Sequence, residues 1–480
     1  MNIIESAKRF FGAALSAAFL LTAMAAHGQL LTVLHTFSAV ESYTNSDGAL
    51  PLGGLTQGPD GSFYGTAEEG GTNGNGTIFK ITPQGAFVLV HTFSAAVDGR
   101  NDDGAYPEAT LTLDGGGNLY GTSVGGGTNG NYGTVFKITT DDTLVTLHTF
   151  NFNDGENPAA PLVFGRDGNF YGAAALGGSN DNGTIFEISS NGAFQTLYDF
   201  SFASNSAADI YTNSDGSRPY GLTQGADSNF YGTTQMGGSN GNGTVFQFTT
   251  NHVLNVLHTF SPQANNGQNA DGASPEAPLA QGLDGGFFGT TPNGGAYATG
   301  IIFRVSTSGD FSTILSFNYF TNGAYLDAPL LLSHGLFFGT AAGFDDGGGT
   351  IFEVTTNGAL RLLYGFSQLD TNSDNSDGAY PETGLTLGRD GNLYGVTSSG
   401  GTNGAGVVFR LTFPMLAISN AANLTILSWP TNQTGFSLQL TTNLAQPDWT
   451  LATPSPTVVG DQFVVSNAAS GPGTFYRLLK

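Results

Sequence analysis

Short apolar runs alternate with polar loops rich in glycine and asparagine along most of this chain. In residues 54–66, two such runs flank the Asp60–Gly61 dipeptide, which is typical of the turn in a β-hairpin. Residues 77–82 and 87–93 follow, and their alternating, β-branched and aromatic side chains predict two further strands. This segment is therefore expected to form a meander of four antiparallel strands.

The same pattern returns along the chain as an internal repeat. Its marker is a pair of apolar or aromatic residues followed by a glycine and a small residue, as in residues 63–66. The marker glycines are Gly65, Gly121, Gly172, Gly232, Gly289, Gly339 and Gly395. Their spacing of about 50 to 60 residues, with four strands in each unit, is typical of the blades of a β-propeller.

The first and last units are incomplete in complementary ways. A strand of the fourth type, residues 31–37, stands before the first full unit, whereas the last unit lacks its own fourth strand after Leu411. We therefore predict an all-β fold whose residues 30–413 form a seven-bladed β-propeller of four-stranded blades, closed by the N-terminal strand. An open solenoid is the alternative, but it would not explain why the extra and the missing strand match.

The repeat stops after Phe413, and the remaining residues have a different composition. Both tryptophans of the chain, Trp429 and Trp449, lie in this segment, among short alternating runs. Residues 414–480 are therefore expected to form a separate small β-sandwich. This segment resembles the immunoglobulin-like or fibronectin-like tails of exported bacterial proteins, and such a tail implies a sorting role.

The N-terminus predicts export. Lys8 and Arg9 precede an apolar run over residues 10–25, and small residues follow as far as Gly28. This order is typical of a secretory signal peptide, here residues 1–28. A transmembrane anchor fits less well because the run is short and has no charged flank after it. We expect an extracellular, cell-surface or periplasmic protein without a transmembrane segment in the mature chain.

Composition narrows the classes of partner. The 480 residues include 72 glycines, only 10% are charged, and the formal net charge is -24, which opposes binding to nucleic acid or to an anionic membrane. Cations or neutral glycans are easier partners for such a surface. The absence of cysteine excludes disulfides, thiol catalysis and thiolate metal sites.

One family resemblance covers residues 30–413. Residues 120–122, the loop with Gly126 and Gly127, and the strand over residues 133–137 together resemble the GloVer tandem repeat. Proteins that carry it are known as choice-of-anchor tandem repeat GloVer-containing proteins, so the resemblance implies export with a variable C-terminal module and implies no particular reaction. The sixth unit departs from the pattern, because Ser333, His334 and Gly335 replace its Asp–Gly turn.

The loop that leads from the fourth strand of one unit to the first strand of the next is called here the lead-in loop. Most lead-in loops share an Asn-x-Asp-Gly pattern with a proline shortly after it. The recurring aspartates are Asp47, Asp103, Asp215, Asp271 and Asp377. Their oxygens are hard ligands of the kind that calcium prefers. The alternative, which we favour, is that Asp and Asn shape tight turns while Gly supplies positive φ.

Other loop side chains carry candidate chemistry. Glu108, Glu276 and Glu382 follow prolines in three units, but paired carboxylates for glycoside hydrolysis should break the repeat rather than follow it, so no catalytic residue is assigned. Four of the histidines, from His35 to His258, share one strand-four position and are interpreted as architectural. The loop tyrosines are candidates for stacking on sugar rings, with loop packing as the alternative, and they are Tyr106, Tyr220 and Tyr380.

We therefore expect an exported, monomeric binding or scaffold module that recognises polysaccharide or an extracellular protein through its loop-rich face. Two alternatives stay open. One is an enzyme, a propeller-type polysaccharide lyase or glycoside hydrolase, whose sign would be an unrepeated cluster of Asp, Glu, His or Tyr near the central channel. The other is a purely structural protein of the cell surface or matrix, because a propeller fold supports many unrelated functions.

Overall fold

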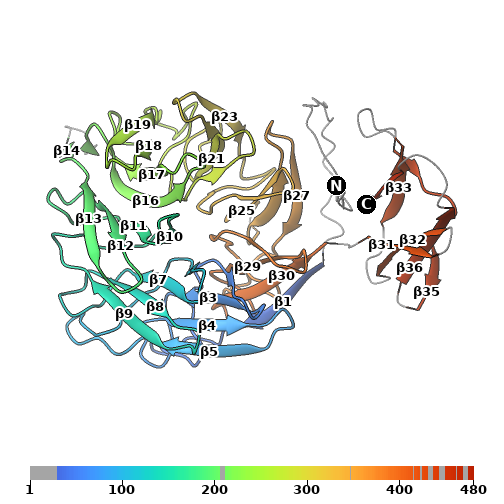
Figure 1. The fold of residues 1–480 in the computed structure, drawn as a ribbon, viewed down its shortest axis with the longest axis horizontal. Helices are drawn as coiled ribbons and strands as arrows, with labels where there is room; N and C mark the ends of the chain where they lie inside the picture. Colours follow the sequence, from blue (N-terminus) through green and yellow to red (C-terminus); the bar gives the residue numbers. More distant parts are fainter. Residues whose placement is uncertain are drawn as a thin grey trace. The chain divides into compact units, whose positions relative to one another are not determined.

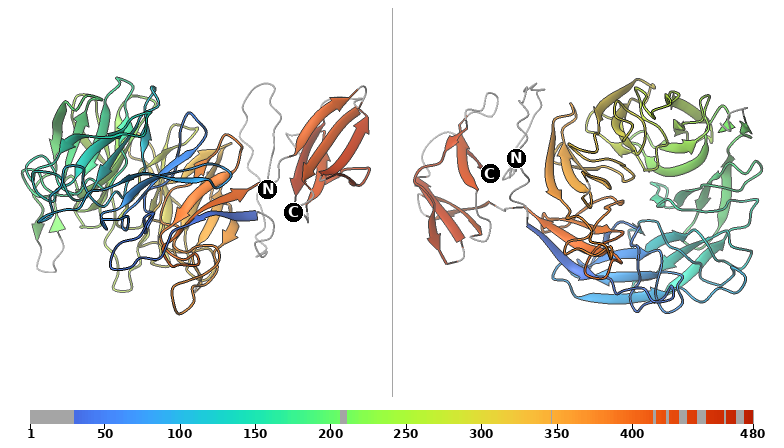
Figure 2. Two further views of the ribbon diagram at one scale, coloured as in Figure 1. Left: turned by 90° about the horizontal axis from the view of Figure 1, so that it is seen from below. Right: turned by 180° about the vertical axis from the view of Figure 1, so that it is seen from behind.

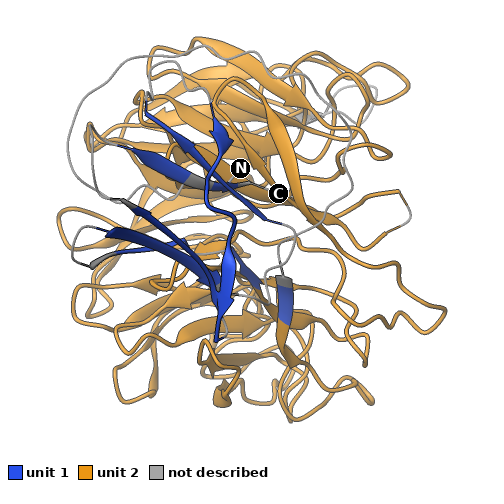
Figure 3. Ribbon diagram, turned by 90° about the vertical axis from the view of Figure 1, so that its right-hand side faces the viewer, with its two compact units in different colours: residues 1–32, 411–480 blue, residues 33–410 orange. Residues whose placement is uncertain are grey.

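The computed structural model describes residues 30–205, 211–345, 347–413, 416–421, 424–430, 436–442, 449–460, 462–468 and 474–479. The chain divides into two compact units, residues 33–410 and residues 1–32 with 411–480 (Figure 3). All regular elements of the described residues are β-strands, which confirms the all-β class. The predicted signal peptide, residues 1–28, lies outside the described residues, and the predicted division at residue 414 stays a prediction.

Within residues 33–410, most sheets use four consecutive strands in antiparallel order. The first contains β2 (Thr56–Gln57), β3 (Phe63–Ala67), β4 (Thr77–Ile81) and β5 (Phe87–Thr92). The second contains β6 (Thr112–Leu113), β7 (Leu119–Ser123), β8 (Thr134–Ile138) and β9 (Leu144–Thr149). The third contains β10 (Val163–Phe164), β11 (Phe170–Ala174), β12 (Thr184–Ile188) and β13 (Phe194–Asp199).

The next sheets follow the same order, after the short pair β14 (Ser204–Asn205) and β15 (Tyr211–Thr212). The fourth contains β16 (Ser217–Gln224), β17 (Phe230–Met236), β18 (Thr244–Phe248) and β19 (Leu254–Thr259). The fifth contains β20 (Ala280–Gln281), β21 (Phe287–Thr291), β22 (Ile301–Val305) and β23 (Phe311–Ser316). The sixth contains β24 (Leu331–Ser333), β25 (Leu336–Ala341), β26 (Thr350–Val354) and β27 (Leu360–Gly365).

The remaining sheet joins the two ends of the repeat. It contains β28 (Thr386–Leu387), β29 (Leu393–Thr397), β30 (Val407–Thr412) and, beside β30, the strand β1 (Leu30–Thr36). Directly after β1, the backbone N–H of Phe37 donates to the carbonyl of Gly406 at 3.1 Å. The strand before the first full unit therefore occupies the fourth position of the last sheet.

The sheets of residues 33–410 lie around a common centre, with short strands such as β10 nearest to it and strands such as β13 farthest from it (Figure 1; Figure 2). This is a propeller-like arrangement. Equivalent contacts join neighbouring sheets. The imidazole of His148 on β9 stacks on Phe194 of β13 at 3.7 Å, and that of His35 on β1 stacks on Phe87 of β5 at 3.8 Å. The ring of Tyr394 on β29 likewise stacks on Phe63 of β3 at 4.0 Å.

The marker glycine has a packing reason. A Cβ added at Gly65 would lie 2.5 Å from the ring of Phe79, closer than real side chains allow. Gly172 and Gly289 meet the rings of Phe186 and Phe303 in the same way. In each sheet of the repeat, a buried phenylalanine of the third strand therefore packs against the glycine of the second strand. This contact explains why the two residues recur together.

The C-terminal unit contains two antiparallel sheets. One has the order β31 (Ala417–Ala421), β32 (Leu424–Pro430), β36 (Gln462–Ala468) and β35 (Thr457–Val459), and the other has the order β34 (Thr450–Leu451), β33 (Ser437–Thr441) and β37 (Phe475–Leu479). Trp429 and Val465 of the first sheet share one core cluster with Leu438 and Leu478 of the second. Throughout the described residues, no helix is both long and apolar enough to cross a lipid bilayer.

Candidate ligand-binding site in the lead-in loops

The asparagine of the Asn-x-Asp-Gly pattern fastens two loops of the same unit. The Nδ2 group of Asn45 donates to the carbonyls of Ser38 and Gly48 at 2.8 and 2.7 Å, while its Oδ1 accepts from the N–H groups of Gly48 and Gly71. Asn213 makes the same set of hydrogen bonds in the fourth unit. The lead-in loop and the Gly–Gly loop therefore lie side by side.

The five recurring aspartates hold the fourth strand to the lead-in loop. In each case the carboxylate accepts from a strand-four side chain, with a donor-to-acceptor distance of 2.8 to 3.0 Å, and from the backbone N–H of a serine. The pairs are His35 with Asp47, His91 with Asp103, Tyr198 with Asp215, His258 with Asp271, and Tyr364 with Asp377. Burial raises the pKa of Asp47, but the hydrogen bonds from His35 and Ser38 outweigh this effect and hold the pKa below its ordinary value.

These aspartates lie in five separate units and are not brought together. Asp215, Asp271 and Asp377 are each more than nine-tenths buried, and the Oδ2 atom of each accepts hydrogen bonds within the protein, whereas Oδ1 of Asp377 is buried without a hydrogen-bond partner among the described residues. Among the described residues, no group of three or more His, Cys, Asp or Glu side chains has a metal-binding arrangement. The geometry favours the turn-shaping interpretation, and calcium binding by these aspartates stays a prediction.

A second position in each lead-in loop adopts an unusual backbone conformation. Seven residues, one in each unit, have a φ between 51° and 59°, a region that residues with a Cβ rarely occupy. They are Leu50, Tyr106, Asn157, Arg218, Ser274, Tyr325 and Tyr380. The backbone is fixed, because the N–H of Tyr106 donates to Asn75 of the previous unit and that of Tyr380 donates to Gly348. The side chain at this position thus varies between units, with tyrosine in three of the seven, on a backbone held by equivalent hydrogen bonds.

Two residues further along, the side chains again differ between units. They are Leu52, Glu108, Ala159, Tyr220, Glu276, Asp327 and Glu382. Burial raises the pKa of Asp327 to about 7, and the charges of Glu276 and Glu382 contribute. Burial likewise raises the pKa of Glu108 to about 7, with Glu68 as the nearby like charge. Burial and then the charges of Glu108, Glu276 and Asp327 raise the pKa of Tyr220. Side chains of six different units therefore influence one another's pKa across a shared space.

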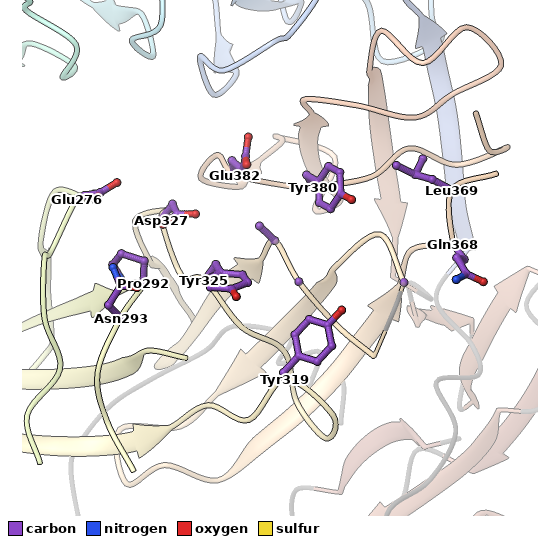
Figure 4. A pocket seen from close by; sticks show the side chains of 13 residues that line it. Glu276, Pro292, Asn293, Tyr319, Tyr325, Asp327, Gln368, Leu369, Tyr380 and Glu382 are labelled. Atoms are coloured by element: carbon purple, nitrogen blue, oxygen red, sulfur yellow. The ribbon is translucent and has the colours of Figure 1, made fainter. Parts of the chain in front are cut away.

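Part of this space is an open pocket of about 880 Å³. Its lining includes three carboxylates, Glu276, Asp327 and Glu382, and the tyrosines Tyr325 and Tyr380. Figure 4 shows Tyr325 near Asp327 and Tyr380 near Glu382, on separate loops. None of the described residues that line it is Lys, Arg or His. We call this the acidic pocket. It combines hydrogen-bond acceptors, negative charge and aromatic rings.

A smaller pocket of about 480 Å³ lies in the first and second units. It is lined by Tyr106 together with Tyr43, Glu68, Asn73 and Asn75, among others. The three predicted loop tyrosines therefore do not form one site. Tyr380 lines the acidic pocket, Tyr106 lines the smaller one, and Tyr220 lines neither but lies within electrostatic range of Asp327. Their role in binding stays a prediction.

Sequence reasoning missed Asp327 and Glu68. Asp327 follows Leu326 rather than a proline, so it does not match the Pro–Glu pattern that drew attention to Glu276 and Glu382. Glu68 precedes a Gly–Gly loop at a position that Val124, Ala175 and other uncharged residues fill in the other units. Alignment of the seven units by their marker glycines would have singled out Glu68, because it alone is charged at that position.

Comparison with known proteins places the repeat in a family. The sequence model of the Gloeobacter/Verrucomicrobia repeat matches residues 20–210 and 203–409. No curated protein sequence matches the chain. Among solved structures, a protein from Lactobacillus plantarum is 14% identical, with a TM-score of 0.46 and a match over 87% of this chain and 99% of that one. A gluconolactonase from Xanthomonas campestris is 10% identical, with a TM-score of 0.38 and a match over 65% of this chain and 86% of that one.

Proposed function

Because this chain belongs to the Gloeobacter/Verrucomicrobia repeat family, which its repeat units had indicated, we propose that it is an exported binding module with a closed seven-bladed β-propeller. The propeller would span residues 30–413 and a small β-sandwich residues 414–480. The acidic pocket would bind polysaccharide at the loop-rich face. The observation that carries the binding role is the combination of Tyr325, Tyr380 and three carboxylates around one open pocket.

Several contacts support a closed propeller. The hydroxyl of Thr56 donates to the carbonyl of Leu111 in the next unit, and the hydroxyl of Thr386 in the last unit donates in the same way to Leu55 in the first. The guanidinium of Arg410 also donates to the carbonyl of Pro83 at 3.0 Å. For the C-terminal unit, the core cluster shared by its two sheets supports a sandwich of immunoglobulin-like or fibronectin-like type.

The chemistry of the pocket suits sugars. Carboxylate oxygens accept hydrogen bonds from sugar hydroxyl groups, and aromatic rings cover the apolar faces of sugar rings. Tyr325 and Tyr380 are 46% and 39% exposed, so their rings are available to a ligand. Their positive φ is held by backbone hydrogen bonds to neighbouring units, which presets the direction of both side chains before any ligand binds.

An enzymatic role is the second candidate. Asp327 has a pKa raised to about 7, and two further carboxylates lie in the same pocket, which is the kind of pairing that glycoside hydrolysis uses. The geometry favours a hydrolase over a lyase. A lyase that acts on acidic sugars needs positive groups to neutralise the substrate carboxylate, and the residues that line this pocket include none.

One experiment separates binding from catalysis. The exported chain would be incubated with a panel of polysaccharides, and retention would be scored together with newly released reducing ends. We expect retention without release, and at least tenfold weaker retention in Tyr325→Ala with Tyr380→Ala. Phe202→Ala is the matched control, because Phe202 is an aromatic residue of another lead-in loop, 72% exposed and outside the pocket. Release of sugar ends that is lost in Asp327→Asn would support the hydrolase instead.

Export and assembly are part of the proposal. We expect the secreted protein to begin at Gln29, which N-terminal sequencing of the protein from culture medium, cell surface and periplasm would test. Light scattering should give the mass of a monomer. Removal of residues 414–480 should release the protein from the cell surface if this segment has a sorting role, and unchanged retention would contradict that role.

A further inference from the structure

The negative charge of the acidic pocket is not balanced within the protein. Some carboxylates outside the pocket meet cations, as Asp284 does with Arg304 at 2.7 Å and Asp60 with Lys80 at 2.8 Å. Among the described residues, none of Glu276, Asp327 and Glu382 takes part in an ion pair. Glu276 accepts a hydrogen bond from the neutral amide of Gln235 at 2.7 Å. Three partly buried carboxylates therefore share one pocket without a counter-charge.

The tyrosines of the pocket add a second, independent feature. Tyr325 and Tyr380 come from the repeat position with positive φ, whereas the carboxylates come from the position two residues later. Their rings are partly exposed and lie beside Asp327 and Glu382 (Figure 4). The face of an aromatic ring attracts a cation, and the attraction grows when the cation is partly removed from water. Aromatic rings and carboxylates around one cavity are the groups that recognise an ammonium ion.

We propose that the acidic pocket selects a sugar that carries a free, protonated amino group, as in a de-N-acetylated amino-sugar polysaccharide. The inference rests on the proposed function and makes its ligand class specific. The ammonium group supplies the missing positive charge between Asp327 and Glu382, while the sugar ring packs against Tyr380. Anionic polysaccharides are repelled by the three carboxylates. Neutral sugars keep the ring contacts but leave the carboxylates without a counter-charge.

A saccharide fits the pocket better than a basic peptide does. The pocket is open, and its polar lining includes the amides of Asn293 and Gln368, which can pair with the hydroxyl groups around a sugar ring. A lysine side chain would place one ammonium group in the pocket but would bring no ring to stack on the tyrosines. Both features of the site are used together only when the amino group is attached to a ring.

The test compares three oligosaccharides of equal length by calorimetry with the full exported chain at pH 7 and low salt. They are a glucosamine oligomer, its fully N-acetylated counterpart and a uronic acid oligomer. We expect the glucosamine oligomer to bind at least tenfold more tightly than the N-acetylated one, and the uronic acid oligomer not to bind. Added salt should weaken the glucosamine complex much more than the N-acetylated complex.

Variants link the selectivity to the pocket. Asp327→Asn and Glu382→Gln should each reduce the preference for the amino form by about fivefold or more while leaving binding of the N-acetylated form nearly unchanged. Glu156→Gln is the matched control, because Glu156 is a partly buried carboxylate of another lead-in loop outside the pocket. Circular dichroism would establish that each variant is folded.

The outcomes separate the two proposals. Equal binding of the amino and N-acetylated forms would overturn the inference and leave polysaccharide binding standing. Binding of neither form, nor of any other polysaccharide in the panel, would overturn both proposals. Tighter binding of an oligolysine peptide than of the glucosamine oligomer would overturn the sugar as ligand.

Discussion

Two carboxylates of one lead-in loop, Asp103 and Glu108, show opposite electrostatic behaviour. Burial raises the pKa of Asp103, yet hydrogen bonds from His91 and Ser94 outweigh it and hold the pKa below its ordinary value. Burial raises the pKa of Glu108 to about 7, and the charge of Glu68 adds to the effect. The first carboxylate is stabilised in its ionised form, and the second is destabilised.

The same contrast runs through the repeat. The Asp–Gly position holds an aspartate in nearly every unit, and the five recurring aspartates each accept a hydrogen bond from the preceding fourth strand, whereas the position five residues later holds Glu, Asp, Tyr, Leu or Ala. A residue that recurs with its partners serves the fold. A carboxylate that varies between units and has no ion-pair partner among the described residues, as at Glu276, Asp327 and Glu382, is a candidate for ligand binding. We therefore expect variation between units to be a better guide to ligand-binding residues than recurrence is.

The largest expected effect is on stability when a recurring aspartate is removed. Asp271→Ala should lower the free energy of unfolding by about 3 kcal/mol, because it leaves His258 and the N–H of Ser261 without their acceptor. Glu276→Ala, five residues later in the same loop, should lower it by less than about 1 kcal/mol. Urea unfolding of both variants measures the difference. Equal losses would contradict the division into structural and free carboxylates.

Removal of the Asp327 charge should have the opposite effect on stability from Asp271→Ala, because at alkaline pH it should stabilise the folded protein. The pKa of Asp327 is about 7 in the folded protein and 3.8 ordinarily, so the folded state binds more protons than the unfolded state between these values. Stability is therefore lost as pH rises through this window. Asp327→Asn should raise the free energy of unfolding by about 1–2 kcal/mol at pH 8 and by nearly nothing at pH 4.

Asp60→Asn controls for the general effect of removing a negative charge, because the pKa of Asp60 is shifted in the opposite direction from that of Asp327. In Asp60, burial raises the pKa but the hydrogen bond from Lys80 outweighs it and lowers the pKa. Asp60→Asn should therefore be neutral or slightly destabilising at pH 8. The comparison would fail if both variants were stabilised equally.

Substitution of Tyr380, whose backbone is strained, should have a smaller effect on the free energy of unfolding. Tyr380 has a φ of 57°, so Tyr380→Gly should relieve backbone strain and raise the free energy of unfolding by roughly 0.5–1 kcal/mol. Tyr380→Ala retains a Cβ and should give no such gain. Both variants remove the ring and should weaken ligand retention alike, so thermal unfolding and binding together separate strain from recognition.

Addition or removal of calcium should have the smallest effect on the stability of the protein. The carboxylates of Asp47, Asp103, Asp215 and Asp271 already accept hydrogen bonds from strand-four side chains and serines. We expect added calcium or chelator to change the melting temperature by less than about 1 °C. A clear increase with calcium that is absent in Asp47→Asn would show that these carboxylates bind the ion after all.

The sequence by itself determined the all-β class, the repeat family and the strands of each unit. These follow from local rules, because alternation of side chains, Asp–Gly turns and a marker glycine act over a few residues. Even the extra strand before the first unit could be predicted, since it is counted from the same pattern. The sixth unit shows how local the rules are, because His334 and Gly335, both with positive φ, still form the turn between β24 and β25 although the Asp–Gly dipeptide is missing.

Only the tertiary structure decided which carboxylates have partners. Asp271 and Glu276 are both acidic loop residues in sequence, but Asp271 accepts from His258 of the preceding fourth strand, whereas Glu276 lies within electrostatic range of Asp327 in the next unit. Asp327 and Glu382 lie 55 positions apart and share a pocket because neighbouring units bring their lead-in loops together. Burial and the charges of neighbouring units set the ionisation of these groups, and both depend on packing between units that no single repeat contains.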